Sequence, residues 1–274
     1  MNQSMINSAV TMGQVQYKLD NVGHNLANAD TTGFKRRDTS FADLMFRQVQ
    51  NQRVGPYEEG RDTPAGIRRG SGAGVAQTAI RFEQGTLQQT GRDLDAAITE
   101  PGFFFELAAA EDGTRRFTRD GAFYLSPAED GTNQLVNGEG EYILGADGAP
   151  AAIPENYAGL RIDETGGIFV TDEDGTEIAA GALQTVEITK PQLLEQQGGG
   201  IVSFPDLEEL GAAEADVLAD GNGAQVVQQQ ALEMANVDTA KQMSDMVAAQ
   251  RHYQFNASAA NMTDQMMGMV TNLR

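Results

Sequence analysis

Glycine is distributed so unevenly along this chain that it divides the sequence into three parts. Only four of the 31 glycines lie within residues 1–34 and 226–274, and the other 27 lie between these segments. Charge follows the same division, because each end has a net charge of −1 and residues 35–225 have a net charge of −18. Glycine is unfavourable inside helices and common in turns. The sequence therefore predicts helical ends that flank a glycine-rich, acidic β domain.

The N-terminal segment, from about residue 4 to residue 28, has the apolar spacing of a helix. Apolar residues recur every seven positions, with small or apolar residues between them, which is typical of an a/d seam. The residues expected on this N-terminal seam are Met5, Met12, Val15, Leu19, Val22 and Leu26. A cluster of turn-forming residues follows at 28–33, where Gly33 can adopt a positive φ and stop the helix.

The C-terminal segment predicts a longer helix over residues 239–272, with Asp238 as a possible N-cap. Its apolar residues form two stripes that lie about 200° apart around the helix axis. The first stripe consists of Met246, Tyr253, Ala260 and Met267, and the second of Phe255, Met262, Met266, Met269 and Leu273. A helix packed against a single core needs one apolar stripe. This helix is therefore either buried inside a large domain, or it packs on the N-terminal helix with one face and on neighbouring subunits with the other.

Methionine is concentrated at the same two ends of the chain. Ten of the 11 methionines lie there, including Met243 near the start of the C-terminal helix, and only Met45 lies in between. The flexible, polarisable methionine side chain fills irregular contacts well. This concentration favours the second interpretation, in which the terminal helices contact other subunits.

The middle of the chain begins with a linker-like stretch at 35–74 and continues with strand patterns. Within the linker, Ser40 could cap a short helix over residues 41–49, and residues 55–60 are rich in helix breakers. From about residue 75, apolar and polar residues alternate, and short apolar runs are separated by Asp-Gly and Asn-Gly turns. Such turns favour antiparallel hairpins.

These patterns predict an α+β fold. The expected regions are a helical core domain formed by residues 1–34 and 226–274, an extended linker with a short helix at 35–74, and an antiparallel all-β domain at 75–225. The two terminal helices are expected to pair as a coiled-coil-like core, with the β domain inserted between them.

Composition excludes several classes of function. A net charge of −20 opposes binding to nucleic acid or to an anionic membrane surface. No run of about 18 apolar residues is present, so membrane insertion is not expected. The absence of cysteine excludes disulfides and thiol chemistry. The first 30 residues lack the pattern of a cleaved signal peptide, so any export would use another route.

No motif points to catalysis, a metal or a cofactor. The acidic segment at 172–176 resembles the start of a calcium loop, but Glu177 and Leu183 occupy the positions that require glycine and glutamate. His24 and His252 could meet if the helices pair, although no carboxylate lies at ligand spacing and polar seam positions explain them better. We therefore expect no catalytic residue, no metal site and no cofactor.

Four segments together resemble the bacterial flagellar rod and hook proteins. They are NLANADTTGFK at 25–35, GTLQQTGRDLDAAI at 85–98 with PGFF at 101–104, FTRDGAF at 117–123, and ALEMANVD at 231–238 with QRHYQ at 250–254. The residues matched in the N-terminal motif are Asn25, Asn28, Thr32, Gly33, Phe34 and Lys35. Those matched in the C-terminal motif are Leu232, Glu233, Asn236, Val237, Asp238, Gln250, Arg251 and Tyr253.

The resemblance implies a structural axial subunit of the flagellar basal-body rod, without enzymatic activity. Proteins of this family pair their terminal helices into a tubular core, are exported by the flagellar type III apparatus, and polymerise into a helical tube that transmits torque and conducts later subunits. The implied partners are copies of the same chain, adjacent rod and hook proteins and the export apparatus. The 35–70 stretch is similar to the longer linker of distal-rod proteins. Glu100-Pro101 and the acidic 201–225 segment depart from the family pattern.

Two alternatives remain open at this point. The chain could be a hook or hook-like subunit of the same family, because the branches share these motifs. It could also be a soluble enzyme or a carbohydrate-binding β domain with helical dimerisation arms. That function needs a concave site with convergent polar groups, and the sequence offers no coherent set of such residues.

Overall fold

The computed structural model describes residues 2–43, 47–49, 67–69, 73–110, 113–128, 131–155, 157–172, 175–205, 207 and 213–272. The chain divides into two compact units. Unit 1 consists of Met1–Leu26, Arg37–Ala79 and Thr239–Arg274, and unit 2 of Ala27–Arg36 and Ile80–Asp238. Segments 27–36 and 226–238 thus group with the β strands of unit 2, and segment 37–79 groups with the terminal segments of unit 1.

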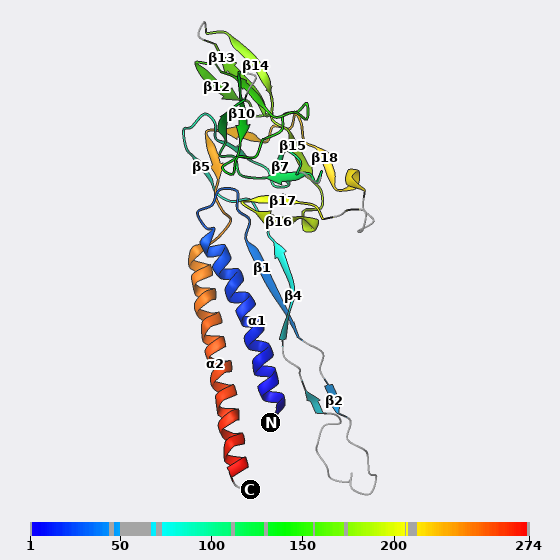
Figure 1. Cartoon of the computed structure of the whole chain (residues 1–274), viewed down its shortest axis with the longest axis vertical. Helices are drawn as coiled ribbons and strands as arrows, with labels where there is room; N and C mark the ends of the chain where they lie inside the picture. The colour runs from blue at the N-terminus through cyan, green and yellow to red at the C-terminus, as the bar shows by residue number, and fades with distance from the viewer. Residues whose placement is uncertain are drawn as a thin grey trace. The chain divides into compact units, whose positions relative to one another are not determined.

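Unit 1 contains both long helices, α1 (Asn2–Ala27) and α2 (Thr239–Asn272) (Figure 1). The helices expected at 4–28 and 239–272 are thus confirmed. The backbone reverses just after α1, where Gly33 has a φ of 67° as the turn-forming cluster predicted. Among the described residues of unit 1, the buried hydrophobic side chains are Val22 and Ala249. This unit therefore has little apolar core of its own.

Unit 1 also contains two nested strand pairs. The outer pair joins β1 (Arg37–Asp43) to β4 (Ala73–Ile80), and the inner antiparallel pair joins β2 (Arg47–Val49) to β3 (Ile67–Arg69).

The short helix expected at 41–49 is wrong, because Phe41 lies in β1 and Val49 in β2. The strongly alternating β4 segment needs a partner for its backbone groups, and β1 pairs with those along one of its edges. Leu44, Met45 and the breaker-rich residues 55–60 lie outside the described residues.

Unit 2 is built around a six-stranded sheet with the strand order β16-β17-β8-β7-β15-β18. Its strands are β16 (Glu195–Gly198), β17 (Ile201–Ser203), β8 (Arg116–Thr118), β7 (Phe103–Leu107), β15 (Thr185–Ile188) and β18 (Leu218–Asp220). Two 3-10 helices, Pro191–Leu193 and Glu214–Asp216, lie in its connections.

Smaller sheets complete unit 2. One three-stranded sheet consists of β11 (Ala152–Pro154), β10 (Thr132–Val136) and β9 (Tyr124–Pro127), and the other of β12 (Gly159–Ile162), β13 (Gly167–Thr171) and β14 (Glu177–Ala182). Two strand pairs join β19 (Val227–Gln229) to β6 (Ala96–Ile98), and β20 (Ala231–Glu233) to β5 (Leu87–Gln89). All these pairs are antiparallel, which confirms the predicted antiparallel β region.

Strand β7 separates the two hydrophobic clusters of unit 2. Phe103, Phe105 and Leu107 point into the larger cluster, whereas Phe104 belongs to the smaller one. Successive side chains of a strand point to opposite faces, so a strand covered on both faces is apolar throughout. The one charged member, Glu106, is buried and accepts two hydrogen bonds from the Arg115 guanidinium, at 2.7 and 2.8 Å.

Candidate functional site

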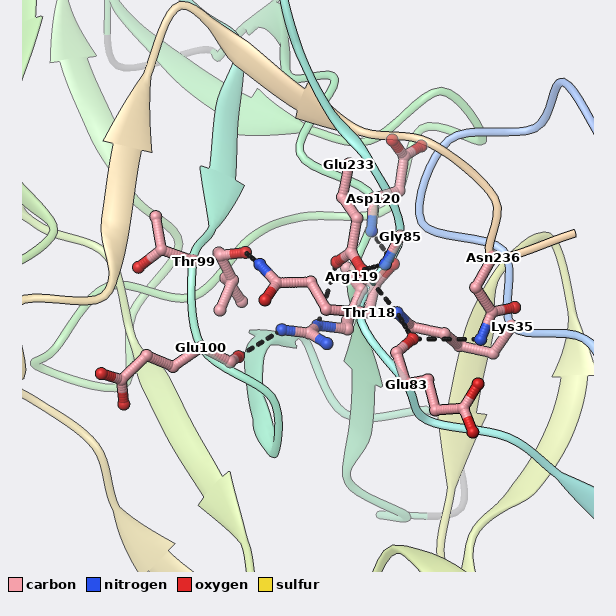
Figure 2. Close-up of polar contacts among 12 residues, drawn as sticks. Lys35, Glu83, Gly85, Thr99, Glu100, Thr118, Arg119, Asp120, Glu233 and Asn236 are labelled. Carbon is pink, nitrogen blue, oxygen red and sulfur yellow. Dashed lines mark hydrogen bonds and ion pairs between the residues drawn. The ribbon is translucent and has the colours of Figure 1, made fainter.

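Residues from all four motif segments meet at one buried place in unit 2 (Figure 2). Lys35 comes from the segment after α1, Gly85 precedes β5, Arg119 follows β8, and Glu233 ends β20. We call this cluster the motif junction. Its members are Thr32, Gly33, Lys35, Gly85, Arg119, Asp120, Gly121, Glu233 and Asn236.

The Glu233 carboxylate lies at the centre of the motif junction, with a side chain that is 0% exposed. Its Oε1 accepts hydrogen bonds from Lys35 Nζ at 2.5 Å and from the Gly85 backbone N–H at 2.7 Å. Lys35 Nζ donates a second hydrogen bond, of 2.9 Å, to the carbonyl oxygen of Glu83. A buried charge requires an opposite charge and hydrogen bonds to offset its lost hydration, and Glu233 supplies both to Lys35.

Arg119 is the second buried cation of the junction, with 1% of its side chain exposed. Its Nε lies 3.3 Å from Glu233 Oε2, within ion-pair range but without hydrogen-bond geometry. Its Nη2 donates to the carbonyl oxygen of Glu100, and its guanidinium lies 5.5 Å from the centre of the Phe104 ring. Glu233 is therefore the carboxylate that contacts two buried cations.

Burial shifts the protonation equilibria of these groups. The pKa of Lys35 is lowered to about 8, chiefly by burial and also by the nearby Arg119 charge, while Glu233 acts in the opposite direction. Burial also lowers the pKa of Arg119, again opposed by Glu233. For Asp120, burial raises the pKa, and a hydrogen bond of 2.6 Å from the Thr32 hydroxyl opposes that shift.

Close backbone contacts hold the motif segments together. A Cβ added at Gly33 would lie 2.6 Å from the backbone of Arg119, and one added at Gly121 would lie 1.6 Å from the carbonyl oxygen of Ala96. The Gly33 N–H donates to the Glu233 carbonyl oxygen at 2.8 Å. Only glycine allows such close approach of two backbones.

Asn236 joins three segments at the edge of the junction. Its Oδ1 accepts a hydrogen bond of 2.7 Å from the backbone N–H of Arg36, and its Nδ2 donates to the carbonyl oxygens of Arg81 and Glu83, at 2.7 and 3.0 Å. The Glu83 carbonyl oxygen thus accepts from both Asn236 and Lys35. The Asn236 amide therefore links its own segment to the backbones of two others, at Arg36 and at 81–83.

The junction is closely packed and leaves little space for a ligand. The void beside Lys35 and Arg119 measures about 10 Å³, which is the space of about one water molecule. Substrate pockets are far larger, at about 300–1,000 Å³. Within the described part of the chain, no group of three or more metal-ligating side chains is found. Neither described helix is long and apolar enough to span a membrane.

The residues of the predicted N-terminal seam share one side of α1. Val22 is buried, and Met5, Met12, Val15, Leu19 and Leu26 are half-buried, whereas Ile6 and Tyr17 between them are exposed. Asn25 is also buried and hydrogen-bonds to both backbone groups of Arg37, at 2.7 and 2.9 Å. Asn28 follows the helix end and is half-buried, as is Thr32.

The two stripes of α2 lie in different environments. In the first stripe, Met246, Ala260 and Met267 are half-buried, and Tyr253 is 39% exposed. In the second stripe, Phe255 is 72% exposed, and Met262, Met266 and Met269 are 47–60% exposed. Met243 is 55% exposed, and Leu273 lies outside the described residues. Among the described side chains of α2, the buried ones are Gln242, Ala249 and Thr263. The largest apolar side chains of this helix thus face solvent.

The C-terminal motif is divided between the two units. Glu233, with half-buried Leu232, Asn236 and Val237, lies in unit 2, and Phe34 of the N-terminal motif is buried there. Asp238 is exposed just before α2, and Gln250, Arg251 and Tyr253 are exposed on α2 in unit 1.

Comparison with known proteins agrees with this motif pattern. Residues 228–273 match the family described as "Flagellar basal body rod FlgEFG protein C-terminal", and residues 97–170 match "Flagellar hook protein FlgE/F/G D1 domain". The chain is 34% identical to the flagellar hook-basal body complex protein FlhP of Bacillus subtilis, over 100% of both chains. This chain belongs to the flagellar rod and hook protein family. It is also 32% identical to the flagellar basal-body rod protein FlgG of Borreliella burgdorferi (100% of this chain, 99% of that protein) and 30% identical to FlgG of Bacillus subtilis (100% of both).

In this rod and hook family member, sequence reasoning identified the motif residues but not their contacts. Lys35 and Glu233 belong to separate motifs, and Arg119 and Gly85 are members of longer matching runs. A useful signal was present at Glu233, which is the charged residue among the apolar and small residues of ALEMA at 231–235. Such residues are candidates for buried ion pairs.

Proposed function

We propose that the protein is a structural axial subunit of the flagellar basal-body rod, which polymerises through α1 and α2 into a helical tube. Its localisation is the flagellar basal body, and its role is mechanical rather than enzymatic. In this proposal α1 and α2 pair as a coiled-coil-like core through the N-terminal seam and the first stripe of α2. The second stripe of α2 contacts neighbouring copies.

The observation that carries this proposal is the exposure of the second stripe. Phe255, Met262, Met266 and Met269 form an apolar series on a helix whose buried positions are small or polar. Single exposed apolar residues are common on soluble proteins, but an aligned series of large ones is typical of an interaction surface. Helical arrays form when one surface binds a different surface of the next copy and the ring does not close.

The experiment compares two double variants of the full chain. Phe255→Ala with Met262→Ala removes two side chains of the second stripe and retains helix propensity. Burying each such side chain is worth about 1.5–3 kcal/mol, so the concentration needed for polymerisation should rise at least about a hundredfold. Sedimentation and electron microscopy measure the polymer, and complementation of a strain lacking the protein measures rod assembly.

The matched control is Gln254→Ala with Gln265→Ala, which changes two exposed polar positions of the same helix. We expect this variant to polymerise like the unmodified chain. Normal polymers and complete basal bodies from the Phe255 and Met262 variant would refute the role of the second stripe.

The proposed partners are further copies of the chain, adjacent rod and hook proteins, and the flagellar export apparatus. The rod and hook relatives are the reason for this proposal, since their names place them in the hook-basal body complex or the basal-body rod.

A hook or hook-like subunit is the second candidate function, because one matched family is described as a hook protein domain. A deletion in the segment between β1 and β4 distinguishes a rod subunit from a hook subunit. Deleting residues 40–65 should convert straight polymers to curved ones if this segment stiffens a rod. Polymers of the unmodified chain that are already curved in electron micrographs would favour the hook assignment instead.

A further inference from the structure

The two compact units carry very different charges. Unit 1 contains ten Lys and Arg against eight Asp and Glu, a net charge of +2. Unit 2 contains nine against 31, a net charge of −22. The whole excess of negative charge in this chain therefore belongs to the β unit, whereas the helical unit is nearly neutral.

Exposed apolar side chains show the opposite distribution. Among the described residues, 13 large hydrophobic side chains are exposed, and ten of them belong to unit 1. These ten are Ile6, Tyr17, Phe41, Met243, Val247, Tyr253, Phe255, Met262, Met266 and Met269. The three in unit 2 are Tyr124, Tyr142 and Ile178. Two independent features, charge and apolar exposure, thus separate the units in the same way.

We infer that unit 2 opposes polymerisation by like-charge repulsion, so that copies associate through unit 1 more readily where salt screens this repulsion. This inference rests on the proposed function. It adds that the surface of unit 2 repels neighbouring copies, whereas unit 1 binds them. Ionic strength would then control assembly.

Chain connectivity makes the repulsion unavoidable. Unit 2 is joined to unit 1 at residues 26–27, 36–37, 79–80 and 238–239, so each copy added through unit 1 brings another charge of −22 to the polymer. The range of the repulsion is set by the Debye length, which is about 30 Å at 0.01 M salt and about 8 Å at 0.15 M. Neighbouring β units therefore repel strongly at low salt and only weakly at physiological salt.

The test uses the full chain and two matched variants of unit 2. One variant changes the exposed residues Glu155, Glu164, Glu187 and Glu195 to Gln, which reduces the charge of unit 2 from −22 to −18. The control changes the same four residues to Asp and keeps the charge. Far-UV and near-UV circular dichroism of dilute samples verify that both variants fold.

Sedimentation of each protein across a series of NaCl concentrations gives the concentration needed for polymerisation. For the unmodified chain it should fall at least about tenfold between about 0.01 M and 0.15 M NaCl, because the Debye length shortens over this range. At about 0.01 M NaCl the Gln variant should need at least about threefold less protein than the Asp variant, since its β units repel less. A general effect of salt on apolar contacts is the same for both variants and cancels in their ratio.

The outcomes separate this inference from the proposed function. Polymers that form at the same concentration at every salt level, or equal thresholds for the Gln and Asp variants, would overturn the inference and leave the proposed function intact. A chain that forms no polymer at any salt or protein concentration would overturn the proposed function itself.

Discussion

Glu233 contacts both buried cations of the motif junction, so removal of its charge should be costly. In Glu233→Gln, Lys35 and Arg119 would remain buried with no carboxylate between them. Removing one partner of a buried ion pair costs about 3–5 kcal/mol, and we expect a loss of this size in the free energy of unfolding of unit 2. Urea unfolding followed by far-UV circular dichroism measures it.

The control is Glu83→Gln. The Glu83 side chain is 68% exposed and pairs with Arg36 at 3.0 Å. An exposed pair of this kind contributes about 0–1 kcal/mol. Equal stability losses for the Glu233 and Glu83 variants would contradict the central role of Glu233.

Lys35 should make the stability of unit 2 depend on pH. Its pKa is lowered from 10.5 to about 8 in the folded chain. Between these values the unfolded state binds more protons than the folded state, so this residue makes the free energy of unfolding rise with pH. The slope is at most about 1.4 kcal/mol per pH unit.

Lys35→Met has no titrating group at this position and removes that slope. The stability of the unmodified chain minus that of Lys35→Met should therefore increase from pH 8 to pH 10, as measured by urea unfolding at each pH. Other groups titrate in both proteins and cancel in the difference. A difference that stays flat or decreases over this range would show that the Lys35 pKa is not lowered.

A substitution at Gly121 tests the close backbone contacts of the junction. In Gly121→Ala the new Cβ would lie 1.6 Å from the Ala96 carbonyl oxygen, and backbone cannot move aside as a flexible side chain can. We expect a loss of about 3 kcal/mol or more in thermal or urea unfolding. Gly138→Ala is the control, because the nearest atom would be a Tyr124 ring carbon at 4.0 Å. A Gly121 variant as stable as the Gly138 variant would refute this contact.

The junction itself could not be predicted from the sequence. Lys35 and Glu233 are separated by 198 residues, and neither local propensity nor periodicity encodes a pairing over that distance. What the sequence did provide was the set of motif segments, since each contains a residue that the junction uses. The contacts between these segments follow only from the three-dimensional packing of β5, β8 and β20.

At the scale of elements, Asn25 links the end of α1 to the start of β1. Its side-chain amide exchanges two hydrogen bonds with the backbone of Arg37, and it is buried. Asn25→Ala would leave an N–H and a C=O without these partners, at a cost of about 1–3 kcal/mol for each group that stays buried. We expect the amides of 37–43 to exchange hydrogen at least about tenfold faster, by mass spectrometry.

The matched control for this link is Asn256→Ala. Asn256 lies on α2 and donates a hydrogen bond of 2.9 Å to the His252 carbonyl oxygen of its own helix. We expect exchange in β1 to be unaffected by this variant. If the amide hydrogen exchange of residues 37–43 is unchanged in the Asn25 variant, pairing with β4 is sufficient to stabilise β1 without the Asn25 side chain.

Elements whose apolar pattern fits a single structure could be predicted closely, and a segment whose pattern fits both a helix and a strand could not. The apolar runs at Phe103–Leu107 and Thr185–Ile188 coincide with β7 and β15, because both strands pair within the core. The segment at 41–49 has apolar spacing that fits a helix, and β1 forms there because β4 offers a paired backbone. A local pattern cannot indicate whether a segment forms a helix or pairs with a strand elsewhere in the chain.

At the scale of the whole molecule, apolar burial is divided as unevenly as charge. Both hydrophobic clusters lie in unit 2, whereas the buried hydrophobic side chains of the described part of unit 1 are Val22 and Ala249. Helices in proteins are stabilised mainly by packing an apolar face, and a segment that buries too little apolar surface cannot offset its conformational entropy. We therefore expect α1 and α2 to be only marginally stable in an isolated subunit and to become stable on assembly.

Limited trypsin digestion tests this expectation, with cleavage after Lys18 and Arg251 as the measured events. Both residues lie within the terminal helices. In a dilute sample shown to be monomeric by ultracentrifugation, both sites should be cut well before Arg119 and Arg116, which belong to unit 2. In sedimented polymer the two helical sites should be protected, because neighbouring copies cover the second stripe. Helices that resist trypsin equally in monomer and polymer would mean that unit 1 is already complete in a single chain, and that its exposed apolar side chains serve some purpose other than assembly.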